Sequence, residues 1–179
     1  MGVIGAAGSN DVATYEQLVS LRLLQSEIPD AANVAAARAV KQAGGRVLIN
    51  AAPARPLSAD LQPLIDIIVV NAIEAEMLAG VPDVETLDGA LEAAKTLANG
   101  FPEVVVTAGG AGVAFAGRDG AEVLITAVKV EVESTHGAGD EFIGVLAAEI
   151  ASGKTMNAAL EKANHAAAKL IATREADRN

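Results

Sequence analysis

The segment GAGD at residues 137–140 combines two glycines with a carboxylate and opens the amphipathic stretch DEFIGVLAAEI. Glycines at the start of a helix present backbone N–H groups and the positive end of the helix dipole, and both attract anions. Asp140 in the first turn could act as a general base beside a bound anion, or it could stabilise the helix end. The spacing therefore predicts an anion-binding helix start, and taken alone it favours the structural role for Asp140.

A second glycine-rich turn, TAGGAG at residues 107–112, follows the apolar stretch EVVVT directly. A dinucleotide-binding fingerprint needs a helix after its glycines, but here a two-residue alternation typical of a hairpin follows, so we exclude a Rossmann site. The turn could let phosphates approach the backbone, or its glycines could serve a tight connection that needs positive φ. The spacing alone does not separate these two roles.

Asn71 and Glu74 stand just past the apolar run DIIVV, where ligands gather in open parallel sheets. Glu74 could hold Mg²⁺ through water. Equally, Asn71 could be a helix N-cap with Glu74 as its capping-box partner, and both roles could hold together. Asn50 also ends a strand but is equally consistent with a turn residue. His136 and His165 are too few and too far apart in sequence to indicate a metal cluster.

Short, nearly all-apolar runs alternate with alanine-rich stretches along the chain, as expected for strands buried on both faces and the helices between them. The predicted strands are 21–27, 46–50, 66–70, 103–107 and KVEVE at 129–133. The predicted helices are 30–43, capped by Asp30 and ended by Gly44-Gly45, then 58–64, 73–79, 87–99, 138–151 and 156–172. Residues 111–130 alternate in twos around Asp119-Gly120 and predict a β-hairpin. The pattern predicts a three-layer α/β/α fold with a mostly parallel sheet.

Composition narrows the classes of function. The chain has 179 residues, which suits one domain over residues 1–179, and the opening GAAGSND suggests that this domain is part of a larger fold. A net charge of −10 argues against nucleic acid and anionic membranes as partners. The absence of cysteine excludes disulfides and thiolate metal sites. With neither a targeting signal nor a spanning apolar stretch in the sequence, the cytoplasm is the expected location.

In order along the chain, these segments resemble motifs of the ribokinase family of ATP-dependent, pfkB-type carbohydrate kinases. The similar segments are LLQSEIP at 23–29, NAAPA at 50–54, NAIEAEMLAG at 71–80, TAGGAG at 107–112, STHGAGDEF at 134–142 and ANHAAAKLIATRE at 163–175. They resemble the family's Gln-Leu-Glu strand end, Asn-Pro-Ala-Pro-Ala loop, Asn-x-x-Glu motif, Thr-x-Gly turn, Asp-Thr-x-Gly-Ala-Gly-Asp signature and adenine-side helix. The NAAPA loop is closest to that of the ribokinases within the family.

The resemblance implies the roles of particular residues in phosphoryl transfer from ATP to a sugar hydroxyl. It makes Asp140 the base that deprotonates the hydroxyl, while the amides of Gly137, Ala138 and Gly139 stabilise charge on the transferred group. It also implies ATP and Mg²⁺ as cofactors. The implied nucleotide contacts are Asn71, Glu74, Thr107, Gly109, Gly112 and, near the adenine, Asn164, with Mg²⁺ held by Glu74 through water.

Three departures from the family pattern shape the expectations. Ser134 replaces the first Asp of the signature, which makes the monovalent-cation site that this Asp helps to build doubtful. Glu175 and Ala176 stand in place of a Lys-Gly pair. No sugar-contact motif or lid precedes residue 21, so we expect a homo-oligomer or association through the exposed sheet. The alternative to a carbohydrate kinase is a non-catalytic nucleotide-binding or oligomerising remnant of one.

Overall fold

Six strands form one mixed sheet in the computed structural model, which describes residues 21–173. The strands are β1 (Leu21–Gln25), β2 (Arg46–Asn50), β3 (Ile67–Asn71), β4 (Glu103–Thr107), β5 (Gly112–Gly117) and β6 (Glu122–Thr126). They lie in the order of the sequence; β1 to β4 are parallel, and β5 and β6 are antiparallel to their neighbours. The predicted mostly parallel sheet and the hairpin within 111–130 are both confirmed.

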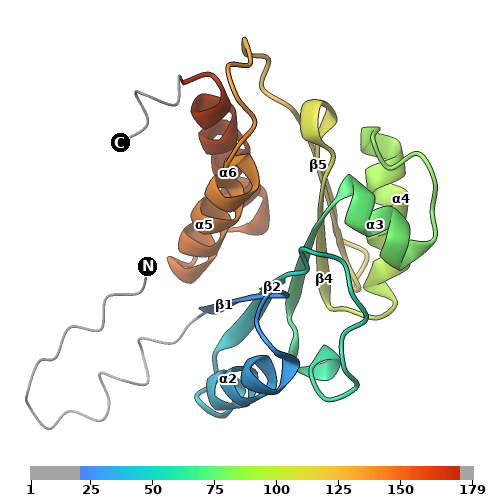
Figure 1. The fold of residues 1–179 in the computed structure, drawn as a ribbon, viewed down its shortest axis with the longest axis vertical. Helices are drawn as coiled ribbons and strands as arrows, with labels where there is room; N and C mark the ends of the chain where they lie inside the picture. The colour runs from blue at the N-terminus through green and yellow to red at the C-terminus, as the bar shows by residue number, and fades with distance from the viewer. Residues whose placement is uncertain (1–20, 174–179) are drawn as a thin grey trace, which may run out of the picture.

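Helices cover both faces of this sheet. They are α2 (Asp30–Gln42), α3 (Ala72–Ala79), α4 (Leu87–Ala98), α5 (Ala138–Ala151) and α6 (Met156–Ile171), with short 3-10 helices η1 (Gln62–Leu64) and η2 (Gly109–Ala111). Figure 1 shows α5 and α6 on one side of the sheet and α3 and α4 on the other. Parallel connections are nearly always right-handed, so strands that advance in one direction place their connecting helices on one face. The other face must then be covered by the helices that follow β6, as α5 and α6 do.

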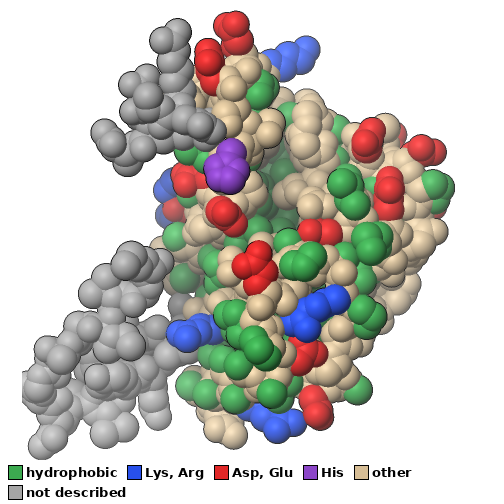
Figure 2. All heavy atoms as spheres, viewed as in Figure 1, with side chains coloured by type: hydrophobic (Ala, Val, Ile, Leu, Met, Phe, Trp, Pro, Cys, Tyr) green, Lys and Arg blue, Asp and Glu red, His purple; other side chains and the backbone are tan. Residues whose placement is uncertain are grey.

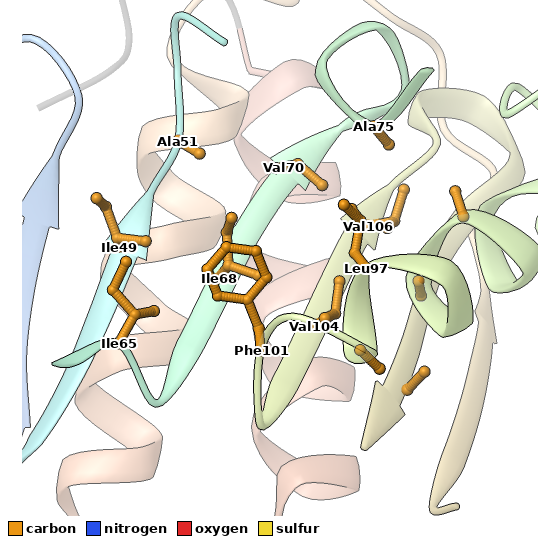
Figure 3. Packing of buried hydrophobic residues seen from close by; sticks show 14 of the residues in the cluster. Ile49, Ala51, Ile65, Ile68, Val70, Ala75, Leu97, Phe101, Val104 and Val106 are labelled. Carbon is orange, nitrogen blue, oxygen red and sulfur yellow. The ribbon is translucent and has the colours of Figure 1, made fainter. Parts of the chain in front are cut away.

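The parallel strands are apolar on both faces, and each face packs into its own core. Val104 and Val106 on β4 pack in the cluster beneath α2, α3 and α4, while Val105 between them packs beneath α5 and α6. Figure 3 shows the first cluster, where Ile49, Ile68 and Phe101 contribute side chains from different segments of the chain. This two-residue alternation is why the strands carry no polar face in the sequence.

Two predicted elements are wrong. Residues 58–64 form a single turn that leads into the 3-10 helix η1, because Pro63 has no amide hydrogen to continue an α-helix. Residues 129–133, predicted as a strand, form none, although Val130 and Val132 alternate with polar residues. Within residues 21–173, β6 is an edge strand, but the segment turns away from it toward α6, where the Glu133 amide donates to the Ile171 carbonyl.

Asp30 does not cap α2 as predicted. The N-cap is Pro29, and Asp30 is the first helical residue. The carboxylate of Asp30 instead accepts a hydrogen bond from the Ser58 amide at 3.1 Å, with Oδ2 as the acceptor. Its other oxygen, Oδ1, lies 2.9 Å from Nη2 of Arg55. Asp30 therefore fastens the loop after β2 to the start of α2.

Candidate functional site

The carboxyl ends of the four parallel strands meet at one edge of the sheet. Gln25 at the end of β1 pairs with Asn50 at the end of β2, and Asn71 at the end of β3 pairs with Thr107 at the end of β4. This edge, which we call the C-terminal edge, is where ligands bind in open α/β sheets. The fold thus brings together at one edge three polar residues that the sequence places far apart: Asn50, Asn71 and Thr107.

The start of α3 at this edge is fixed by a reciprocal pair of hydrogen bonds. Asn71 accepts from the Glu74 amide at 2.9 Å through Oδ1, and Glu74 accepts from the Asn71 amide at 2.9 Å through Oε2. The two residues form the predicted capping box. Glu74 is buried whereas Asn71 is exposed. One carboxylate oxygen of Glu74 is therefore committed to the backbone.

The turn between β4 and β5 contains two glycines, Gly109 and Gly112, whose surroundings differ. Gly112 has φ of 128°, and a Cβ built there would lie 2.0 Å from the Ile125 carbonyl oxygen on β6. Only glycine allows β5 and β6 to approach this closely. Gly109 has φ of 50°, is exposed, and has no atom within 4 Å of its would-be Cβ. Gly112 is thus required by packing, whereas the backbone at Gly109 is open to a ligand.

The start of α5 has the geometry expected of an anion-binding helix end. Gly137 is the N-cap with φ of 79°, and Asp140 lies in the first turn, exposed together with Gly139. The Ala138 amide donates to the Thr135 carbonyl at 3.3 Å, a long bond. Within residues 21–173, no backbone carbonyl accepts from the amides of Gly139 or Asp140, as first-turn geometry requires. These two amides are available to an anion beside the Asp140 carboxylate.

The segment that connects β6 to α5 brings this helix start toward the C-terminal edge. It leaves the sheet where the Ala127 amide donates to the Ala111 carbonyl, at 3.1 Å, and it reaches the end of α6, where the Glu133 amide donates to the Ile171 carbonyl at 2.8 Å. In Figure 1 the start of α5 and the turn before β5 lie at the same end of the molecule. Figure 2 shows the surface hollowed between these two parts.

Asn164 joins α6 to the end of β6. Its side chain is buried, and Nδ2 donates to the Thr126 carbonyl at 3.0 Å. Because Thr126 pairs with Gly112, this bond holds α6 against the glycine turn. Asn164 therefore has a positioning role at the edge where the sequence places a nucleotide contact.

Sequence reasoning missed the clamp on the loop after β2. Nη2 of Arg55 donates to the Ile28 carbonyl at 2.8 Å and also pairs with Asp30, so the loops after β1 and β2 are tied together at the C-terminal edge. No spacing rule links Asp30 to Arg55. The parallel pairing of β1 and β2, which places both loops at the same edge, is the signal that could have found the clamp.

Other features lie away from this edge. Two open cavities, of about 490 and 620 Å³, share Pro102 and Arg118 and lie at the opposite end of the strands.

Within residues 21–173, no three His, Cys, Asp or Glu side chains are grouped as metal ligands. No helix in the same range is both long and apolar enough to cross a membrane.

The fold has three α/β/α layers, and its structural match to a ribokinase assigns it to the ribokinase-like class. Comparison with known sequences gives the family. Residues 7–179 match the pfkB family of carbohydrate kinases, and the chain belongs to that family. The expected family resemblance is confirmed.

Individual relatives agree with this assignment. The chain is 35% identical over 168 residues to a ribokinase of Schizosaccharomyces pombe, which covers 88% of this chain and 52% of that protein. It is 37% identical over 147 residues to a ribokinase of Haemophilus influenzae, with 82% and 47% covered. The structure of Arabidopsis thaliana ribokinase complexed with ribose and ATP matches with a TM-score of 0.79 and 31% identity, covering 92% of this chain and 54% of that one. The chain spans about half the length of these relatives.

Proposed function

We propose that this chain supplies the nucleotide-binding and proton-accepting part of an ATP-dependent sugar kinase. The observation that carries the proposal is the position of the α5 start, where the exposed Asp140 carboxylate stands beside the open amides of Gly139 and Asp140. Membership of the pfkB family and the likeness to a ribokinase complexed with ribose and ATP support it.

Asp140 is our proposed catalytic base. Phosphoryl transfer needs alignment and charge neutralisation more than covalent help, so a carboxylate that accepts the acceptor hydroxyl's proton and an adjacent anion site are the essential parts. Asp140 is exposed and stands in the same helical turn as the open amides, so a hydroxyl and a phosphate could meet there. Glu141 is also an exposed first-turn acid, and it provides a matched comparison.

The phosphates of ATP require a local site, because the chain carries a net charge of −10. We propose that the backbone at Gly109 and the amides of Gly137, Ala138 and Gly139 form that site, with Thr107 beside it. The bond from Ala138 to Thr135 would have to yield to the anion. Gly112 contributes by letting the turn fold against β6, and we assign it no direct contact.

Mg²⁺ fits this edge through water. Oε2 of Glu74 and Oδ1 of Asn71 are both engaged in the capping box, so direct coordination through either would break the start of α3. Mg²⁺ retains several waters and commonly meets proteins through one or two carboxylates, which suits contact with the second oxygen of Glu74. When bound, the ion would supply charge neutralisation on the phosphates of ATP.

We propose that the adenine lies against α6 and that Asn164 shapes this side of the nucleotide site by holding α6 to Thr126.

The substrate would be a small sugar or sugar-like molecule, as the names of the relatives indicate for those proteins. The relatives are kinases, which gives no support to a non-catalytic remnant. An enzyme that consumes ATP is consistent with the cytoplasm, which we keep as the proposed location.

We further propose that the chain associates through β1. Within residues 21–173, β1 has β2 as its single neighbour in the sheet, and Leu21 and Leu23 are half-buried beside the core beneath α5. An unpaired apolar edge of this kind invites another strand. The strand could come from a second copy or from another segment, and light scattering of the purified chain tells these apart: a dimer supports the first, a monomer the second.

The experiment that tests the proposed function is Mg²⁺-dependent ADP release by the purified chain across a panel of sugars that includes ribose. Asp140→Asn should reduce the sugar-stimulated rate by at least about 100-fold, the lower range for losing a general base. Glu141→Gln removes the same charge from the same turn and should leave most of the rate. Equal losses in the two variants would mean that charge at the helix end matters and that Asp140 is not the base.

A further inference from the structure

The turn that precedes α5 is held by the protein's own hydrogen bonds. The amides of Glu133 and Ser134 both donate to the Ile171 carbonyl at the end of α6, at 2.8 and 3.3 Å. The Ser134 hydroxyl oxygen then accepts from the His136 amide at 3.3 Å. The chain therefore anchors the turn to α6 on one side and closes it locally on the other.

The side chain at residue 134 does not supply the charged oxygen that the family signature would bring to a monovalent cation. Where the signature has a carboxylate, Ser134 offers a neutral hydroxyl, which is already engaged with the His136 amide. A neutral oxygen lacks the charge–charge attraction that a carboxylate gives a cation at short range. Within residues 21–173, no three His, Cys, Asp or Glu side chains are grouped as metal ligands, so no such cluster stands at this turn.

We propose that internal hydrogen bonds replace a bound monovalent cation in setting this turn, so that the start of α5 keeps its shape in any alkali-metal salt. One consequence rests on the proposed function: nucleotide binding and phosphoryl transfer would not depend on K⁺. The structural part stands on the contacts of Ser134 and on the Ile171 carbonyl. It assigns Ser134 a positioning role in the turn.

The test is thermal unfolding of the chain without nucleotide, in KCl, NaCl or N-methylglucamine chloride at equal ionic strength. The wild-type Tm should agree across the three salts to within about 1 °C, well below the ~2–4 °C that 1 kcal/mol produces in a chain of this size. A saturable rise in Tm that is specific to K⁺ would overturn the proposal. Because no nucleotide is present, the result stands even if the chain proves unable to bind ATP.

Two variants sharpen the test. Ser134→Ala removes the hydroxyl and should lower Tm equally in all three salts. The variant loses the hydrogen bond from the His136 amide, and there is no bound cation for it to lose. Ser134→Asp restores the charge of the family signature and should make Tm respond to K⁺ while remaining insensitive to N-methylglucamine. A fall in the Tm of Ser134→Ala that is confined to KCl would show that Ser134 ligates K⁺, and the proposal would fail. An Asp variant without any response to K⁺ would show that residue 134 does not control the cation.

Discussion

Replacing Gly112 by alanine tests the steric need for glycine at this position, which differs from the ligand contact that we propose for Gly109. The new Cβ would lie 2.0 Å from the Ile125 carbonyl oxygen and 2.7 Å from the Ala127 amide nitrogen, inside the 3.0 Å that Cβ atoms essentially never reach. Both obstacles are backbone, so β6 would have to move away from β5. Backbone strain at φ of 128° costs about 1–3 kcal/mol, and each lost ladder hydrogen bond adds roughly 1 kcal/mol.

We therefore expect Gly112→Ala to lower the free energy of unfolding by about 3–5 kcal/mol, against a typical total of about 5–15 kcal/mol. Gly109→Ala is the matched control: its φ is 50° and it has open space around the new methyl. Its cost should be about 1–2 kcal/mol, that of a left-handed alanine.

Urea denaturation of both variants, followed by circular dichroism, measures the difference. If the proposed phosphate contact is correct, Gly109→Ala should also weaken Mg-ATP binding while the protein stays folded. Equal losses of stability in the two variants would refute the steric argument at Gly112. Unchanged ATP affinity in Gly109→Ala would refute the ligand-facing role of Gly109.

Three further predictions concern the supports of the site. Asn71→Ala should destabilise the chain by about 0.5–2 kcal/mol through loss of the capping box with Glu74, as measured by urea denaturation; no loss would mean that the box contributes nothing in solution. Asn164→Ala leaves the Thr126 carbonyl without its partner and should cost about 1–3 kcal/mol. In this variant, backbone amide hydrogens of β5 and β6 should exchange faster with solvent. Unchanged exchange would contradict the positioning role of Asn164. Leu146→Ala empties a fully buried site beneath the sheet and should cost about 2–5 kcal/mol; a loss below 1 kcal/mol in the same denaturation assay would mean that this core is loosely packed.

The sequence predicted those parts of the fold that depend on local pattern. Helix α5 begins at Ala138 and ends at Ala151, both as predicted, because the glycines before it and its apolar face are local signals. The capping box at Asn71 and Glu74 was predictable for the same reason, since its two members are three residues apart. Strands buried on both faces were recognisable from their unbroken apolar texture.

The rest depended on contacts between distant residues. The partner of Asp30 is Ser58, 28 residues away, and no local signal distinguishes this contact from a helix cap. The alternation at Val130 and Val132 resembles a strand, but the segment turns away from β6 toward the end of α6 instead of pairing with β6. Likewise, the sequence could not show that Gly112 faces the Ile125 carbonyl whereas Gly109 faces open space.

We propose that the C-terminal edge, with the start of α5, is the Mg-ATP site of a pfkB-family sugar kinase. Backbone amide shifts, followed by ¹H–¹⁵N NMR as Mg-ATP is added, locate the bound nucleotide on the chain. We predict that the largest saturable shifts fall on Gly109, Gly139 and Asp140. Shifts centred instead on Arg118 and the cavities at the opposite end of the strands, or no saturable shifts at all, would contradict the claim.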